Sequence, residues 1–490
     1  MMRRIILSIC IPFLIANFLH AQISENMSLL GQWKDDTLPS RYGSVYNDVW
    51  GFVHGNREYA IIGSAGYTHF VDVTDPGNLT EVARFKEHSL SLWRDYKSYG
   101  FYSYGMAQES VPWNPSGMQI FYHGSLPDSI TKVYDDNTLF TTAHNIFIDE
   151  PNGRLYVAGS NVRNNGLLVL DLTGDPANPS LLASVPLPGG YVHDVYVRDN
   201  IAYCSHGNAG LYIYDFTNPT SPALIGNLTS YPQQGYNHSS WLTDDGNFLV
   251  FADETHGRPL RLVDITDLSD ITILSTFQSQ LLAPAATNSI PHNPIIRGDY
   301  VFISYYHDGI QVYNISDVIA PERVAYYDTD TLFTNYSGYE GAWGVYPNLP
   351  SHNILGSDQL NGLFVLHFDL LNPIVPQPPQ LVADISPETV TPAPVKPTKE
   401  KGSSVLSPIE VNLYPNPAPK DKNVNLQIAN NLQEEAKIRI YDLTGKIIWE
   451  RETSISVTKN LAIPRLKPGI YNVSIHTEKQ YVNRKLIVED

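Results

Sequence analysis

Short segments of alternating apolar and polar residues recur from Tyr46 to Asp369 and predict β-strands throughout this region. The segment His193–Asn227 gives the pattern most completely, as HDVYVRDNIAYCSHGNAGLYIYDFTNPTSPALIGN. It reads as a strand, a tight turn, a second strand, a glycine-containing loop, a third strand ending in Asp, a Thr/Pro/Asn turn and a fourth strand. Four short strands in a repeating unit predict one blade of a β-propeller.

The same phrase occurs seven times, and the first residues of successive copies lie 45 to 54 residues apart. This spacing brackets the roughly 40 to 50 residues expected for a four-stranded blade. The sequence therefore predicts an all-β fold, a seven-bladed β-propeller. The copies begin at Asn47, Arg94, His144, His193, His238, His292 and Glu340.

The seventh copy lacks a fourth strand of its own, because the chain becomes proline-rich after its third strand, GLFVLHFD. The segment Ser28–Trp33 (SLLGQW) resembles the fourth strands LLASV and LIGNL of other copies. We expect it to complete the seventh blade, which would join the two ends of the ring and remove a free sheet edge.

The start of the chain has the features of an export signal, since Arg3 and Arg4 precede an apolar run that ends near Ala21. We therefore expect a signal peptide over residues 1–21 and the propeller over residues 22–371. Removal of the signal leaves Cys204 as the one cysteine, so no disulfide is expected. No later stretch approaches the roughly 18 uninterrupted apolar residues of a membrane-spanning helix, and we expect no transmembrane segment.

Residues 372–408 are rich in proline and poor in apolar residues, which predicts an extended linker. Residues 409–490 alternate again and predict a small β-sandwich. Four landmarks follow in order within this part: LYPNP, YDLTG, GIY and KLIV. They resemble the C-terminal sorting domain of the type IX secretion system, and the sorting motif comprises Tyr414, Pro415, Asn416, Pro417, Gly445, Gly469, Tyr471 and Lys485.

That resemblance implies Sec export followed by passage through the outer membrane of a Gram-negative, Bacteroidota-type bacterium, with the type IX machinery as partner. The product would be secreted or attached to the outer-membrane surface. The repeats in turn resemble the choice-of-anchor B family of LVIVD-repeat β-propellers, through DVWGF, FVDVTDP, AHNIFIDE, NHSSWLTDDG, PHNPIIRG and AWGVYPNLPS. This second resemblance implies a fold and a destination but no chemistry, and the chain departs from the repeat at Asn314, where Asp is usual.

The charge balance limits the classes of partner. The chain has 32 basic and 50 acidic residues, a net charge of −18. This balance argues against nucleic acid and anionic lipid as ligands, whereas it accommodates a cationic partner or a divalent ion. An acidic surface also serves solubility alone.

Histidines are the main chemical signal in the repeats. His144, His193, His238 and His292 begin the innermost strand of four successive blades, so a ring would place them around one rim of the central channel. His206, His256 and His307 fall in the loop between the second and third strands, which we expect on the same face. The candidate metal or ligand rim is His144, His193, His238, His292, His206, His256, His307, Glu254, Glu340 and Arg94.

Two interpretations of this rim remain open. Imidazole nitrogens and carboxylate oxygens suit a divalent transition metal as cofactor. Alternatively, each histidine is a polar plug that is hydrogen-bonded at a repeated structural position. Alternation along the inner strand also leaves open whether His193 or Asp194 faces the channel.

The local signatures of serine hydrolases, zinc proteases and nucleotide-binding proteins are absent from the sequence. Cys204 lies inside a strand, which favours a place in the core over a role as nucleophile. We favour a secreted or surface-displayed binding module whose ligand is a protein, a glycan or an ion. The alternative is a metal-dependent extracellular enzyme in which the metal activates a water molecule and Glu254 or Glu340 acts as the base.

Overall fold

The computed structural model describes residues 24–331, 335–370, 410–414, 418–419, 424–442, 447–463, 465–476 and 481–489. The expected signal peptide and the expected linker lie outside these residues, as do Pro415, Asn416, Pro417 and Gly445 of the sorting motif. The chain divides into two compact units, residues 1–379 and 380–490, and each is described by itself.

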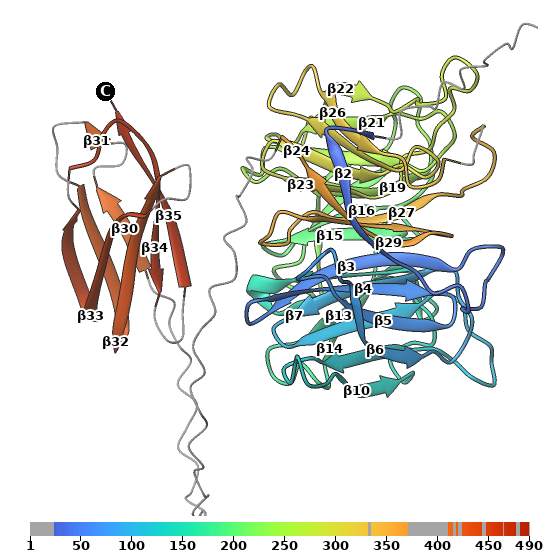
Figure 1. The fold of residues 1–490 in the computed structure, drawn as a ribbon, viewed down its shortest axis with the longest axis horizontal. Helices are drawn as coiled ribbons and strands as arrows, with labels where there is room; N and C mark the ends of the chain where they lie inside the picture. Colours follow the sequence, from blue (N-terminus) through green and yellow to red (C-terminus); the bar gives the residue numbers. More distant parts are fainter. Residues whose placement is uncertain are drawn as a thin grey trace, which may run out of the picture. The chain divides into compact units, whose positions relative to one another are not determined.

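The first unit consists of seven antiparallel sheets (Figure 1). The innermost strand of each sheet contacts that of the next, and the last contacts the first, which confirms the predicted seven-bladed propeller. The first blade consists of β3 (Tyr46–His54), β4 (Arg57–Ser64), β5 (Tyr67–Asp72) and β6 (Thr80–Lys86). The second consists of β7 (Arg94–Tyr99), β8 (Tyr102–Ala107), β9 (Met118–Tyr122) and β10 (Thr131–Asp136). The third consists of β11 (Asn145–Asp149), β12 (Arg154–Ser160), β13 (Arg163–Asp171) and β14 (Ser180–Pro186). A short 3-10 helix, η1 (Glu150–Asn152), joins β11 to β12.

The fourth and fifth blades are β15 (Asp194–Arg198), β16 (Ile201–Ser205), β17 (Leu211–Asp215) and β18 (Ala223–Leu228), then β19 (Asn237–Leu242), β20 (Phe248–Asp253), β21 (Leu260–Asp264) and β22 (Thr272–Phe277). The sixth blade is β23 (Pro294–Arg297), β24 (Tyr300–Ser304), β25 (Ile310–Asn314) and β26 (Glu322–Tyr327), and the seventh is β27 (Ala342–Tyr346), β28 (Ile354–Asp358), β29 (Gly362–Phe368) and β2 (Met27–Trp33). Among the described residues, no helix has the length and hydropathy that crossing a bilayer requires.

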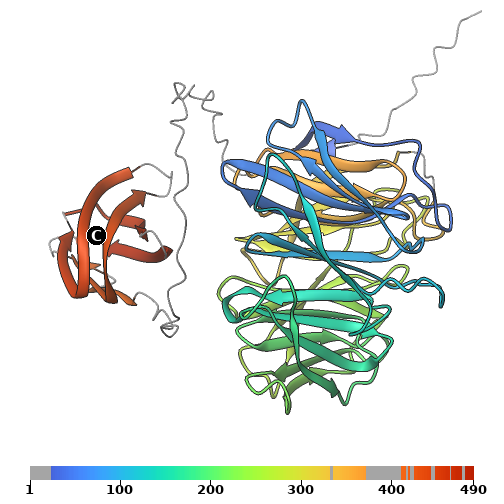
Figure 2. The same ribbon diagram turned by 90° about the horizontal axis from the view of Figure 1, so that it is seen from below.

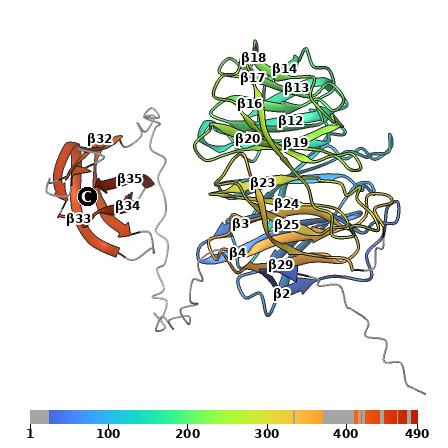
Figure 3. The ribbon, with the colours of Figure 1, turned by 90° about the horizontal axis from the view of Figure 1, so that it is seen from above.

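Ring closure follows the expectation from the sequence. The strand β2 pairs with β29 from Met27 opposite Phe368 to Trp33 opposite Leu363, so the start of the propeller completes its last blade (Figure 3). A two-residue strand that was not predicted, β1 (Ser24–Glu25), adds a fifth strand to the sixth blade by pairing with β26. The N-terminal segment therefore holds two neighbouring blades together.

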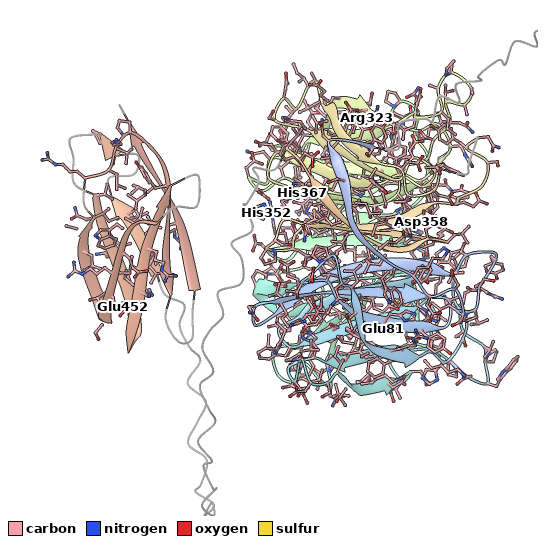
Figure 4. The ribbon with its side chains drawn as sticks, in the orientation of Figure 1. Glu81, Arg323, His352, Asp358, His367 and Glu452 are labelled. Carbon is pink, nitrogen blue, oxygen red and sulfur yellow. The ribbon has the colours of Figure 1, made fainter. Side chains whose placement is uncertain are left out.

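The apolar core is divided among the interfaces between adjacent blades. Phe52 and Phe70 of the first blade, for example, pack against Tyr96 and Phe121 of the second. Each blade is covered on both faces by its two neighbours, so a strand inside a blade, such as β4, is buried along almost its whole length. The fourth strands lie outermost and carry polar side chains, including Glu81 on β6 and Arg323 on β26 (Figure 4).

The Asp residues that end the third strands stabilise the turns that follow. Asp72, Asp171, Asp215 and Asp264 each accept a hydrogen bond from the backbone N–H two residues later. Asn314 accepts the same bond from Ser316 through its amide oxygen. The departure from the repeat at Asn314 therefore preserves the hydrogen bond and removes only a charge.

The second unit is all-β. Its strands are β30 (Glu410–Tyr414), β31 (Ala418–Pro419), β32 (Val424–Asp442), β33 (Ile447–Ile463), β34 (Gly469–His476) and β35 (Tyr481–Glu489). The long strand β32 pairs with β30 through its first half and with β34 through its second half. The strands curve around a core that includes Leu426, Ile438 and Val473 (Figure 2).

Candidate functional site

A cavity of ≈ 110 Å³ lies where the innermost strands meet at the centre of the ring. The first strand of every blade lines it, so it belongs to the central channel rather than to a single blade. One lining residue from each of these strands is Asp48, Arg94, Asn145, Asp194, His238, Pro294 and Trp343.

Four of the candidate histidines form an arc along this cavity. His144 and His193 immediately precede β11 and β15, and His238 and His292 take similar places in the next two blades. Successive ring centroids are 3.9 Å, 4.4 Å and 4.5 Å apart. The repeat of the blade thus brings four imidazoles that are far apart in the sequence into mutual contact.

Three of these rings have one nitrogen held by the surrounding structure. His292 Nδ1 donates to the carbonyl oxygen of Trp343 at 2.5 Å, and His144 Nδ1 lies 2.8 Å from Gln108 Oε1. His193 Nδ1 lies 3.2 Å from the hydroxyl of Tyr236. The other nitrogen of His193, Nε2, is buried and has no hydrogen-bond partner among the described residues.

Glu254 completes the arc from the second strand of the fifth blade, since it follows β20 directly. Its Oε2 lies 3.7 Å from His238 Nε2, and its Oε1 lies 3.9 Å from His292 Nε2. Tyr306 donates a hydrogen bond of 2.5 Å to Oε1. Burial raises the pKa of Glu254 to about 7, although the Tyr306 hydroxyl opposes this shift.

Burial also sets the protonation of the histidines. Desolvation lowers the pKa of His144 to about 4 and that of His292 to about 3. Desolvation, with repulsion from neighbouring imidazoles, lowers the pKa values of His193 and His238 well below the usual value. All four rings are therefore neutral at pH 7 and present nitrogen lone pairs.

A second polar layer follows one residue along each inner strand. Lys97 Nζ lies 2.5 Å from Asp95 Oδ1, and Asp95 Oδ2 also accepts hydrogen bonds from the third blade, from Asn145 Nδ2 and the Ile146 backbone. Burial raises the pKa of Asp194 to about 8, with repulsion from Asp95 as a further cause, and raises that of Asp48 for the same reasons. This layer therefore holds the carboxyl groups of Asp48, Asp95 and Asp194. The ammonium group of Lys97 reaches it from two residues beyond Asp95, and the raised pKa values show that a proton is favoured on Asp48 and Asp194.

Aromatic rings form a third layer, three residues beyond the histidine positions. Tyr196 contacts Phe147 at 5.0 Å and Trp241 at 4.7 Å between ring centroids. Lys97 Nζ lies 4.5 Å from the centroid of Trp50. Because residues three positions further along a strand lie roughly 10 Å away, these rings line the cavity at a different depth from the histidines.

The remaining candidates lie in different surroundings. Arg94 lines the cavity, but its guanidinium pairs with Glu87 at 3.1 Å and donates to backbone carbonyls of Ser64, Ala65 and Ser89. The cavity lining does not include His206, His256, His307 or Glu340.

Those four residues contact other groups. His206 packs against Tyr212, and His256 against Tyr339, with ring centroids 4.8 Å and 5.3 Å apart. His307 Nε2 lies 3.3 Å from Glu340 Oε2.

Several cavity residues were not among the candidates. In the seventh blade Trp343, rather than Glu340, takes the place that corresponds to His238, because the same register shift in the pairing with the second strand occurs at both residues. The Glu340 side chain is 46% exposed. Asp48, Asp95 and Lys97 were also missed. The signal that could have found Asp48 and Asp95 is their fixed position, one residue after the histidine position of the repeat.

Neither His193 nor Asp194 is excluded from the channel, since both line the cavity.

Cys204 lies fully buried in the core between the third and fourth blades. Burial raises the pKa of its thiol well above the usual value, which makes it a poor nucleophile.

Comparisons with known proteins match parts of the chain. The family described as "Secretion system C-terminal sorting domain" matches residues 412–489, and "LVIVD repeat" matches residues 154–186 and 189–230. The two LVIVD segments correspond to β12–β14 and to the whole fourth blade. No protein with a curated description matches the chain.

Solved structures with a related arrangement include the computationally designed Ika8 protein, with 9% identity and a TM-score of 0.42 over 69% of this chain and 98% of that chain. The RRP9 WD40 repeats give 9% identity and a TM-score of 0.46 over 69% of this chain and 96% of that chain. Neither similarity informs the cavity. The chain combines a seven-bladed β-propeller that contains LVIVD repeats with a secretion-system C-terminal sorting domain, which implies a secreted or cell-surface protein of a Bacteroidota-type bacterium.

Proposed function

We propose that this chain is a secreted or surface-displayed binding module that takes its ligand at the histidine-lined cavity of the propeller channel. One observation carries the proposal: four neutral imidazoles and Glu254, contributed by four different blades, lie next to one another along a single cavity.

A purely structural role explains part of this arrangement. His292 and His144 are satisfied by a backbone carbonyl and a glutamine side chain, as polar plugs would be. His193 Nε2 lacks such a partner, and leaving a buried polar group unpaired costs about 1–3 kcal/mol. A ligand that pairs with this nitrogen would offset that cost, and this consideration favours binding over plugging.

Tryptophan emission provides the test, because four of the seven tryptophans line the cavity, namely Trp50, Trp93, Trp241 and Trp343. The full chain would be titrated with divalent cations, small ammonium compounds and oligosaccharides. We expect at least one class to change the emission of the wild type but not of His193→Ala/His238→Ala. The matched control is His256→Ala, which lies outside the cavity. An equal response from the double variant would contradict the proposal.

A metal-dependent extracellular enzyme is the second candidate, favoured by one specific contact. Tyr306 donates to Glu254 beside two imidazoles, which is an arrangement suited to holding a carboxylate as a general base. Turnover of a substrate that depends on added metal and is lost in Glu254→Gln would support this function. Glu340→Gln is the control, since the Glu340 side chain pairs with His307 outside the cavity.

For the export route we propose passage by Sec and then by the type IX system. The match of residues 412–489 to a sorting domain supports this proposal, together with the signal-like start of the sequence.

A further inference from the structure

Two overlapping triads in the cavity have the chemistry of metal ligands. They are His144, His193 and His238, and His238, Glu254 and His292, and within each triad the ligand atoms lie within 4.8 Å of one another. Resting on the proposed function of this cavity, we propose that His238, Glu254 and His292 ligate a single divalent transition-metal ion of the Zn²⁺, Co²⁺ or Mn²⁺ class.

The triad that contains Glu254 places a carboxylate close to two imidazoles. In a tetrahedral site with metal–nitrogen bonds of about 2.1 Å, neighbouring ligand atoms are about 3.3 to 3.5 Å apart. Glu254 Oε2 lies 3.7 Å from His238 Nε2, and Glu254 Oε1 lies 3.9 Å from His292 Nε2. All ligand atoms of the triad lie within 4.8 Å of one another, so binding one ion would draw them together by up to about 1.4 Å. Imidazole nitrogen with one carboxylate is a donor set that Zn²⁺, Co²⁺ and Mn²⁺ accept.

The surroundings orient these ligands in the manner of an outer coordination shell. His292 Nδ1 donates to the Trp343 carbonyl, which leaves Nε2, the atom that faces Glu254, with its lone pair available. Tyr306 donates to Glu254 and fixes one of its oxygens. Tyr306 has a φ of +35°, a left-handed conformation that is costly for a residue with a side chain. Its backbone also meets the seventh blade closely, because a Cβ atom on Gly341 would lie 2.4 Å from the Tyr306 carbonyl oxygen.

The basic side chains of the cavity do not oppose a cation at the same place. Glu254 and the carboxyl groups of Asp48, Asp95 and Asp194 line the cavity, and Lys97 is the cationic side chain that lies among them. The guanidinium of Arg94 is already paired with Glu87. Both basic side chains that line the cavity are therefore paired with carboxylates, so neither leaves an uncompensated charge that would repel an ion held by His238, Glu254 and His292.

The two triads cannot both be filled through one atom of His238, because a ring nitrogen has a single lone pair for one metal ion. We therefore expect one ion per chain. This assignment also gives Glu254 the role of a ligand, so a metal-dependent reaction here would need a base other than Glu254.

The test is equilibrium binding of Zn²⁺ alone to the full chain, followed by elemental analysis, with Co²⁺ absorption spectra as a second measurement. We expect one ion per wild-type chain. Loss of an outer-shell partner typically weakens metal affinity about 10- to 100-fold, so we expect roughly 10-fold for Tyr306→Phe and more than about 100-fold for His292→Ala and Glu254→Gln. The glutamine keeps the size of the side chain, so a folding defect is not expected to mimic the loss.

His256→Ala and Glu340→Gln are matched controls and should bind Zn²⁺ as the wild type does. His144→Ala separates the two triads, because it should keep the ion if the triad with Glu254 holds it. Full affinity in His292→Ala or Glu254→Gln, or loss of the ion in His144→Ala, would overturn the assignment. Failure of wild type to bind Zn²⁺, Co²⁺ or Mn²⁺, with another ligand still sensed through His193 and His238, would overturn the metal site but leave the proposed function standing.

Discussion

His206 illustrates how burial in this ring controls a side chain's chemistry without any charged partner. Its ring packs tightly against the backbone at Gly189, where a Cβ atom would lie 2.5 Å from His206 Nδ1, and against Tyr212. Burial lowers the pKa of His206 to about 4, and the nearby backbone of residues 189–191 opposes this shift only partly. The ring is therefore neutral at pH 7 in the folded protein.

A pH-dependent loss of stability follows. In the unfolded chain His206 takes up a proton near its ordinary pKa of about 6.5, whereas the folded chain resists protonation down to about pH 4. Above pH 6.5 the His206 ring is neutral in both the folded and the unfolded chain, so it adds no pH dependence to stability. As the pH falls from 6.5 to 4, only the unfolded chain takes up the proton, and the free energy of unfolding decreases. Urea unfolding at pH 7, 5.5 and 4 measures the free energy of unfolding. Between pH 7 and pH 4 this free energy should decrease by about 3 kcal/mol less in His206→Phe than in the wild type. Identical pH dependence in the two proteins would contradict this account.

At this scale the sequence predicted which histidines occupy the repeated position but not their neighbours. Alternation applies within a strand, whereas His193 precedes β15 and Asp194 begins it, so both line the cavity. Lys97 was missed because a lysine within a strand usually indicates an exposed face, and here three carboxyl groups and the ring of Trp50 surround it.

Among the elements, the fourth strands must let the next blade approach closely. A Cβ atom on Gly31 of β2 would lie 1.9 Å from the carbonyl oxygen of Pro76, in the turn before β6 of the first blade. Gly226 of β18 meets Leu268 of the fifth blade in the same way, at 2.9 Å. The likeness between SLLGQW and LIGNL that predicted ring closure thus includes a glycine with the same packing role.

We expect Gly31→Val to weaken ring closure, because the backbone of the first blade would have to move away. Overpacking of this kind typically costs about 1–3 kcal/mol. Gly226→Val should lower the free energy of unfolding by less, because a Cβ atom at Gly226 would lie 2.9 Å from its nearest neighbour, compared with 1.9 Å at Gly31. Denaturant unfolding of both variants measures the difference, and equal or reversed costs would show that close approach of the next blade is not what requires these glycines.

The sequence predicted β2 because seven residues carry a recognisable pattern, whereas the two residues of β1 carry none. The start of the seventh blade was misplaced by three residues for a related reason. No histidine marks that copy, and Trp343 within AWGVY reads as an ordinary apolar strand residue.

In the whole molecule, binding and export are assigned to different units of the chain. The cavity lies within residues 1–379, and the match to the sorting domain lies within residues 380–490. We therefore expect that deleting residues 410–490 leaves the propeller folded but retained in the periplasm. Cell fractionation with antibody detection measures this, and His193→Ala in the full chain is the control that should be exported normally. Export of the truncated chain at the wild-type level would contradict the assignment.

The central claim is that the histidine-lined cavity holds a ligand rather than a polar plug. A crystal structure of the full mature chain, purified from its producing cells, tests this claim most directly through the electron density beside His193 Nε2. We predict density for a bound ion or organic group in contact with the histidine arc. Well-ordered water as the sole neighbour of His193 Nε2, with the other imidazoles paired only to protein, would contradict it.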